Sequence, residues 1–394
     1  MDFPIYLDNN ATTRVDDRVL SAMLPYFTGK YGNAASRNHA FGWIAEEAVD
    51  LAREQVAQLL GATSREIVFT SGATEAINLA LKGIFEAYKN KGNHIITCVT
   101  EHKAVLDTAK HIELLGGKVT FLPVKEDGLI DLQLLEDACT DPTILISVMH
   151  ANNETGVIQP IAKIAEIAHA HGALFFSDAT QAVGKIPLNV EQMGIDLLAL
   201  SAHKMYGPKG AGALYVRRRN PRVKLIPQID GGGHERGIRS GTLNVPGIVG
   251  FGKACELCLE EMKNESDRLS SLRDKLENAL LASGDCSVNG SKTARLPHVT
   301  NLAFHGIDAE TLIATMQNIA VSSGSACASA SLEPSHVLKS MGRSDEMARS
   351  SIRFGLGRFT TNEEIEFAIQ KVKQETHHLR SLSSTWKLHR EGIR

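Results

Sequence analysis

The chain has 394 residues, of which 43% are hydrophobic and 22% charged, and its formal net charge is −3. This length can bury a large core and predicts two domains. The small net charge and the pI of about 6.6 argue against a nucleic-acid partner or an anionic membrane surface. No apolar run reaches membrane-spanning length, and the acidic start does not resemble a signal peptide. Because the six cysteines are scattered and do not suggest a disulfide framework, we expect a soluble cytoplasmic protein.

The first two-thirds of the chain alternates between apolar strands and amphipathic helices, after a short N-terminal strand that runs into a polar turn. The expected strands cover 66–70, 94–99, 118–122, 143–149, 173–178 and 195–200, followed by a short apolar run at 213–216. Helices are expected across 41–60, 75–88, 104–115, 132–138 and 161–171. Strands that are apolar throughout and joined by helices predict an α/β fold with a mostly parallel, doubly wound sheet.

A long helix is expected from 244 to 281, where charged residues recur at solvent-facing spacing. Beyond it, short strands at 299–304 and 351–355 mix with helices at 309–319 and 362–381, which predicts a smaller α+β domain. We therefore expect three parts: an N-terminal arm (1–14) that packs with the small domain, a large α/β domain (15–260) and the small domain (261–394). Cys255 and Cys258 share one helix face without a second Cys/His pair nearby, which favours packing over metal binding.

Polar residues gather directly after the expected strands, where ligands bind in open α/β sheets. They are Ser71–Thr74, Thr100–His102, His150–Glu154, Asp178–Gln181 and Ser201–Lys204. The first is a small-residue turn at a helix N-terminus, which suits a phosphate, although an ordinary helix cap has the same composition. The last contains a lysine just past a buried strand, which suits a Schiff-base amine, although an isolated loop lysine is usually solvated.

Taken together, these groups match the needs of pyridoxal phosphate: an amine, a carboxylate for the pyridine nitrogen, a planar group against the ring and donors for the phosphate. A nicotinamide site would need a Gly-x-Gly-x-x-Gly turn after the first strand, and none is present. The glycine-rich run at 207–212 lacks the Walker spacing. The sequence thus predicts a pyridoxal-phosphate site at this edge of the sheet.

Two further residues stand out in the second part of the chain. Cys327 lies in a run of very small residues (321–331), which is typical of an accessible, reactive thiol rather than of a packed one. Arg353 lies on an expected strand, where it either binds a carboxylate through two hydrogen bonds or pairs with a surface acid.

These motifs resemble those of the cysteine desulfurases of the NifS/IscS type. The resemblance covers nearly the whole chain. It rests on Tyr-Leu-Asp-Asn-Asn-Ala-Thr-Thr at 6–13, Thr-Ser-Gly-Ala-Thr-Glu at 70–75, Thr-Glu-His-Lys-Ala-Val-Leu-Asp-Thr at 100–108, Asn-Asn-Glu-Thr-Gly at 152–156, Asp-Ala-Thr-Gln at 178–181, Ser-Ala-His-Lys at 201–204, Gly-Gly-Gly-His-Glu-Arg-Gly with Arg-Ser-Gly-Thr at 231–242, and Ser-Ser-Gly-Ser-Ala-Cys at 322–327.

The resemblance implies a fold-type I pyridoxal-phosphate enzyme that converts L-cysteine to L-alanine and keeps the sulfur as an enzyme persulfide. It implies that Lys204 carries the cofactor and moves protons, and that Cys327 accepts the sulfur. The other implied roles are as follows: His102 stacks on the ring and assists proton transfer, Asp178 pairs with the pyridine nitrogen, Gln181 binds the ring hydroxyl, Ala73, Thr74, Ser201, His203 and a second subunit's Thr242 bind the phosphate, and Asn153 and Arg353 hold the substrate carboxylate.

The resemblance also implies a homodimer that passes sulfur to an iron–sulfur scaffold or another acceptor protein. No permanent metal site is expected, although Cys327 could serve as a transient cluster ligand. The alternatives are a selenocysteine lyase or another pyridoxal-phosphate enzyme on the same fold, and, from a different class, a non-catalytic protein that binds a phosphorylated ligand.

Overall fold

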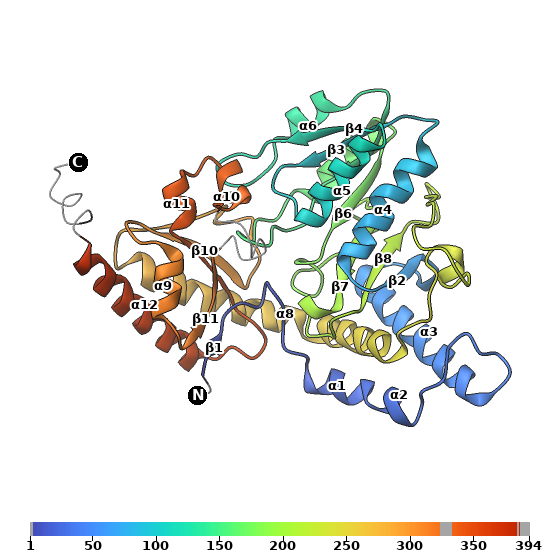
Figure 1. Cartoon of the computed structure of the whole chain (residues 1–394), viewed down its shortest axis with the longest axis horizontal. Coiled ribbons are helices and arrows are strands. Elements are labelled where there is room, and N and C mark those ends of the chain that lie inside the picture. Colours follow the sequence, from blue (N-terminus) through green and yellow to red (C-terminus); the bar gives the residue numbers. More distant parts are fainter. Residues whose placement is uncertain (1–2, 324–332, 384–385, 387–394) are drawn as a thin grey trace.

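A seven-stranded sheet, called here the large sheet, organises the first part of the computed structural model, which describes residues 3–323, 333–383 and 386 (Figure 1). Its strand order is β2-β8-β7-β6-β5-β3-β4. The strands are β2 (Ile67–Thr70), β3 (His94–Cys98), β4 (Lys118–Leu122), β5 (Thr143–Ser147), β6 (Leu174–Asp178), β7 (Leu197–Ser201) and β8 (Gly212–Val216). Except in the edge strand β4, every residue of these strands is buried, because helices cover both faces.

All strands of the large sheet run in one direction except β8, which pairs antiparallel with both β2 and β7. The mostly parallel, doubly wound α/β sheet predicted from the sequence is confirmed. The run at 213–216 turns out to be a hairpin partner of β7 rather than another parallel strand. As a result, the carboxyl ends of the other six strands meet at one edge of the sheet.

Two sets of helices sandwich the large sheet. On one face lie α4 (Ala73–Tyr88) and α5 (Lys103–Leu114), and on the other α3 (Ala40–Leu60), α6 (Leu132–Ala138), α7 (Ile161–Ala170) and the start of α8 (Val245–Leu281). The short helices α1 (Asp17–Met23) and α2 (Pro25–Thr28) pack against α8. Helices α3 and α8 approach closely because Gly252 has no side chain: a Cβ there would lie 2.6 Å from the Ala52 Cα.

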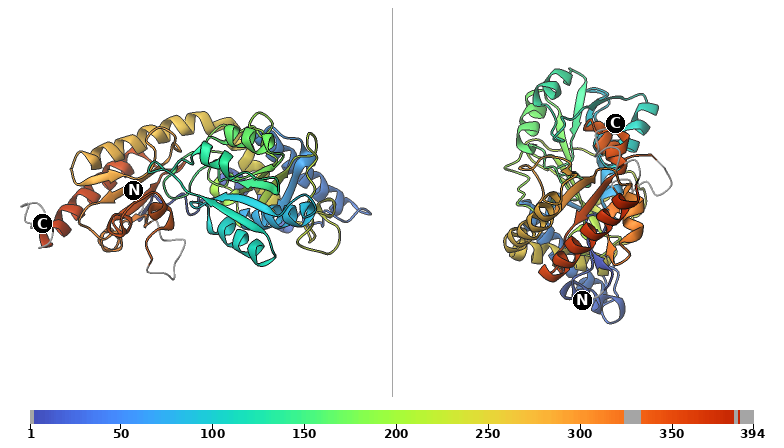
Figure 2. Two further views of the ribbon diagram at one scale, coloured as in Figure 1. Left: turned by 90° about the horizontal axis from the view of Figure 1, so that it is seen from above. Right: turned by 90° about the vertical axis from the view of Figure 1, so that its left-hand side faces the viewer.

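A second, four-stranded antiparallel sheet, called here the small sheet, is built from the later part of the chain. Its order is β12 (Ser322–Ser323), β13 (Ser351–Gly355), β10 (Val299–Phe304) and β9 (Cys286–Val288). The second half of α8, together with α9 (Ala309–Thr315) and α12 (Asn362–Leu382), supplies its apolar core, and α10 (His336–Ser340) and α11 (Asp345–Arg349) complete this part. Figure 2 shows α8 running from one sheet to the other. It passes unbroken through residue 260, so the expected boundary between 15–260 and 261–394 falls inside a helix and stays a prediction.

The N-terminal arm runs from the small sheet to the large one. Ile5–Tyr6 (β1) pairs in parallel with Ile319–Ala320 (β11). The sequence had placed Ile319 at the end of a helix from 309, but that helix (α9) ends at Thr315. Further along, the Thr13 backbone N–H donates to the His203 carbonyl at 2.9 Å, beside the end of β7. The arm therefore brings residues 8–12 between the two sheets. In the described ranges, no helix combines the length and apolar character needed to cross a membrane.

Candidate active site

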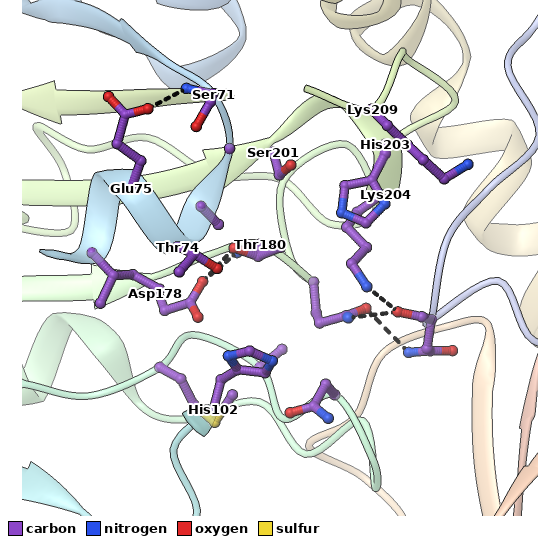
Figure 3. A pocket seen from close by; sticks show the side chains of 18 of the residues that line it. Ser71, Thr74, Glu75, His102, Asp178, Thr180, Ser201, His203, Lys204 and Lys209 are labelled. Atoms are coloured by element: carbon purple, nitrogen blue, oxygen red, sulfur yellow. Dashed lines mark hydrogen bonds between the residues drawn. The ribbon is translucent and has the colours of Figure 1, made fainter. Parts of the chain in front are cut away.

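A cavity of about 440 Å³ opens at the edge where the six parallel strands end (Figure 3). The arm, the helix N-termini and the small sheet contribute to its walls. Its lining includes ten of the residues predicted from the sequence: Ala73, Thr74, His102, Asn153, Asp178, Gln181, Ser201, His203, Lys204 and Arg353. These residues come from positions up to 280 apart in the chain, so the fold has assembled them at one place.

Lys204 ends a single 3-10 turn (Ala202–Lys204) that directly follows β7. Its ammonium Nζ donates hydrogen bonds to the carbonyls of Asn10 (2.5 Å) and Ala11 (2.6 Å) in the arm. Figure 3 shows Lys204, Asp178 and His102 converging on the same space. The amine is therefore aimed into the cavity and held there by backbone acceptors, which is not the geometry of a solvated loop lysine.

Donors for an anion gather at the N-terminus of α4. Helix geometry leaves the first N–H groups of α4 without partners inside the helix, and its N-cap Gly72 supplies no side-chain cap. A Cβ at Gly72, whose φ is +155°, would extend to 3.7 Å from the Ser201 hydroxyl, so the missing side chain keeps this space open. His203 lies beside it, and burial together with Lys204 and Lys209 lowers its pKa to about 4, so the ring is neutral and can donate through one nitrogen. This end of the cavity suits a phosphate.

Asp178, the last residue of β6, supplies the carboxylate. Its Oδ1 accepts two hydrogen bonds from Thr180, one from the backbone N–H (3.0 Å) and one from the hydroxyl (2.5 Å). Gln181 is held by the arm: its Nε2 donates to the Asn10 carbonyl (3.0 Å), and its Oε1 accepts from the Asn10 side chain (3.2 Å). Both predicted ring-binding residues are thus fixed in one orientation by neighbours that the sequence did not single out.

His102 is the N-cap of α5. Its Nδ1 accepts a hydrogen bond from the Ala104 backbone N–H at 3.1 Å, which leaves Nε2 for the cavity. The preceding residue, Glu101, is fully buried and accepts from the Met149 backbone N–H, and burial raises the pKa of its carboxyl well above its usual range. His102 is therefore placed by its own helix cap and by a rigid, buried neighbour.

Arg353 reaches the cavity from the central strand β13 of the small sheet and is only 2% exposed. Its Nη1 donates to the Asn153 carbonyl (2.9 Å), and its Nη2 forms an ion pair with the Asp8 carboxylate in the arm (2.6 Å). The sequence left open whether this arginine binds a carboxylate or pairs at the surface. Its burial in the cavity wall favours the first, with an internal acid as an additional partner.

Three residues at the site were missed by sequence reasoning as functional positions: Asp8, Asn10 and Thr180. All lie in motifs quoted above, but only the tertiary contacts reveal what they touch. Two predicted residues are not placed in the cavity. Cys327 lies outside the described residues, and Thr242, which was expected to act in a second subunit's site, is exposed on this chain and does not line the cavity.

The donor set fits pyridoxal phosphate. An anion site, an amine and a carboxylate line one cavity, and the Asn10 Oδ1 is buried without a partner in the described part of the chain. Lys204 would hold the aldehyde carbon, Asp178 the ring nitrogen, and the α4 N-terminus the phosphate. The fold and the site together define a fold-type I pyridoxal-phosphate enzyme.

Comparison with known proteins narrows this class. Residues 5–367 match the aminotransferase class-V family. The chain is 57% identical over 394 residues to the cysteine desulfurase IscS of Anaeromyxobacter sp. (strain Fw109-5), covering 100% of this chain and 97% of the relative. It is 56% identical to that of Pasteurella multocida (strain Pm70), covering 100% and 98%. A solved NifS-like protein superposes with a TM-score of 0.88 at 39% identity, covering 94% of this chain and 98% of the other.

The chain therefore belongs to the class-V aminotransferases and, within them, to the cysteine desulfurases of the IscS type. The predicted family, fold-type I architecture, cofactor and activity are confirmed.

Proposed function

We propose that this cavity converts L-cysteine to L-alanine, with Lys204 as the cofactor-bearing and proton-transferring residue and Cys327 as the sulfur acceptor. The observation that carries the proposal is the convergence of an amine, a fixed carboxylate and a buried arginine on one cavity at the strand ends. A protein that merely bound a phosphorylated ligand would need the α4 N-terminus but neither Lys204 nor Asp178.

The bound cofactor supplies an electron sink for the electron pair left when the substrate Cα loses its proton. Lys204 Nζ takes that proton and returns one, and the Asn10 and Ala11 carbonyls keep the amine pointed into the cavity. Asp178 presents a negative charge to the protonated ring nitrogen, and Thr180 fixes the orientation of its carboxylate. His102, which lines the same cavity, would cover the ring of the bound cofactor and assist proton transfer.

Arg353 and Asn153 hold the substrate carboxylate, so that the Cα–H bond lies near Lys204. The Cys327 thiolate attacks the substrate sulfur. A bond forms between the two sulfurs as the Cβ–S bond breaks, and Cβ takes up a proton to give the methyl group of alanine. The sulfur is oxidised and Cβ is reduced in the same step, so that no external oxidant is needed.

The same proposal extends to the assembly and to the fate of the sulfur. A homodimer would bring Thr242 of one subunit to the phosphate end of the other's cavity, consistent with the exposure of Thr242 on the single chain. The Cys327 persulfide would pass to an iron–sulfur scaffold or another acceptor in the cytoplasm.

A product assay tests the chemistry. With cysteine and a reductant, the holoenzyme should release equal amounts of alanine and sulfide, whereas Cys327→Ala should bind cofactor and cysteine but form no alanine. Cys139→Ala, which changes a half-buried thiol that donates to the Leu135 carbonyl, is the matched control and should keep full activity. Full turnover by Cys327→Ala would refute the role of the thiol. Turnover of selenocysteine without turnover of cysteine would favour the lyase alternative.

A further inference from the structure

We propose that Asp8 is a resident counter-ion of Arg353, which orients the guanidinium and lowers the affinity of the active site for carboxylate ligands. This inference rests on the proposed role of Arg353 in holding the substrate carboxylate. It assigns a specificity-determining function to the N-terminal arm, in which Asp8 acts through Arg353 and does not itself touch the reacting atoms.

The backbone of the arm fixes Asp8 against β13. Gly355 of β13 donates its N–H to the Leu7 carbonyl (2.7 Å) and accepts from the Asn9 N–H (3.0 Å), which places Asp8 in a parallel bridge beside the strand. The Asn9 side chain adds a second hydrogen bond to the Gly355 carbonyl (2.9 Å). Because three hydrogen bonds hold the residues on either side of Asp8, its backbone stays beside β13 and its carboxylate stays within reach of Arg353.

The neighbours of Arg353 accept hydrogen bonds from only some of its N–H donors. Nη2 pairs with Asp8 and Nη1 donates to the Asn153 carbonyl, but Nε is buried without a hydrogen-bond partner in the described part of the chain. The guanidinium has five N–H donors in a planar fork, so further donors remain for a carboxylate in the cavity. Asp8 thus fixes one end of the fork and leaves donors for a ligand.

Of the described titratable groups near Arg353, Asp8 is the one that balances its positive charge. Arg353 also acts on the carboxyl of Glu154, but burial raises the pKa of Glu154 to about 7, and Glu154 accepts a hydrogen bond from Ser335. Burial, with a contribution from Arg353, lowers the pKa of His298 well below its usual range, so the ring of His298 is neutral. Tyr6 faces both Asp8 and Arg353, and burial raises its pKa, so it too is neutral. The ion pair with Asp8 is therefore the contact that balances the charge of Arg353 before any ligand binds.

The consequence is that a ligand carboxylate must share a cation that already has an anion beside it. Two like charges near one buried guanidinium repel each other, which weakens binding. The arm would thus keep the product alanine from being retained by its carboxylate, while the hydrogen bond from Nη2 keeps the fork in position.

Binding of L-alanine to the holoenzyme tests this inference without relying on turnover. Asp8→Asn keeps an oxygen that can accept from Nη2 but removes the charge. We expect the dissociation constant of L-alanine, measured by equilibrium dialysis, to fall about tenfold. The dissociation constant of L-alaninamide, which lacks the carboxylate, should stay within about twofold, and so should that of L-alanine for the control Asp17→Asn, which removes an exposed ion pair with Arg14.

Two further variants keep the outcomes distinct. In an Arg353→Gln background, Asp8→Asn should have no effect on L-alanine binding. An unchanged or higher dissociation constant in Asp8→Asn, or an equal shift for L-alaninamide, would overturn the role of Asp8. If Arg353→Gln alone did not weaken L-alanine binding, the proposed role of Arg353 would fail instead. Should Asp8→Asn not fold, Asp8→Ser measures the same charge removal.

Discussion

Asp178 and Arg353 line the same cavity, but the chain holds them in opposite ways. Asp178 ends a strand of the large sheet, and its carboxylate accepts two hydrogen bonds from Thr180, two residues later. Arg353 comes from the small sheet and is held by Asp8, 345 residues away in the chain, and by Asn153, 200 residues away. At the cofactor end of the cavity, the Asp178 carboxylate is therefore fixed by a local turn, whereas at the substrate end Arg353 is fixed by contacts between distant segments. This difference predicts that variants at the two ends will disturb different steps.

The largest effect is expected at the substrate end. Arg353→Lys keeps a positive charge but loses the planar fork, so both the Asp8 ion pair and carboxylate binding suffer. We expect KM for cysteine to rise about a hundredfold. The amount of cofactor bound should not change, because the cofactor end does not depend on this contact. The exposed Arg349, changed to lysine, is the control and should behave as the wild type. Loss of cofactor from Arg353→Lys would show that cofactor binding also depends on the substrate end of the cavity.

A smaller effect is expected at the cofactor end. Thr180→Val removes the hydroxyl that donates to Asp178 Oδ1 but keeps the backbone donor. Because a hydrogen bond to a charged group is worth about 1.5–3 kcal/mol, we expect the dissociation constant of pyridoxal phosphate to rise about tenfold. Fluorescence titration of the apoenzyme measures it. Thr180→Ser should restore the wild-type value, and an unchanged constant in Thr180→Val would show that the Asp178 turn holds without the hydroxyl.

The smallest effect concerns the stability of the contact between the two parts. Glu154, in the large part, accepts a hydrogen bond from Ser335, the N-cap of α10. Burial raises the pKa of Glu154 to about 7. As pH rises from about 4.5 to 7, the unfolded chain loses this proton while the folded chain keeps it, so the free energy of unfolding falls.

Glu154→Gln removes this penalty and keeps an oxygen acceptor for Ser335. We expect the variant to be about 1–2 kcal/mol more stable than the wild type at pH 8 and no more stable at pH 4, as measured by urea unfolding of the holoenzyme. The exposed Glu136→Gln is the control. Equal stability of Glu154→Gln and the wild type at both pH values would mean that the Glu154 carboxyl is not held protonated in the folded chain.

The sequence predicted the cofactor end well because its signals are local. Asp178, His102 and Lys204 each follow a buried apolar strand closely, so the strand pattern alone places them at one edge. The antiparallel direction of β8 was not predicted, because a short apolar run after a Gly/Pro loop has the same pattern in either direction.

The residues of the substrate end could not be predicted from the strand pattern in this way. Arg353 looked equally like a ligand-binding residue and a surface residue, and Asp8 carried no assigned role, because their pairing depends on how the arm lies along β13. The position of the expected domain boundary was obscured for a similar reason, since α8 is continuous and contributes to both cores. Contacts between segments hundreds of residues apart leave no periodic trace in a single sequence.

Borohydride reduction of the holoenzyme followed by peptide mass mapping tests the central claim, that Lys204 carries the cofactor in this cavity, most directly. Reduction makes a lysine–cofactor linkage permanent, so the added pyridoxyl mass marks the lysine that formed it. If Lys204 carries the cofactor, reduction should give one modified peptide, labelled at Lys204, and no label in Lys204→Ala. A label on Lys209, which also lines the cavity, or no covalent label at all, would contradict it.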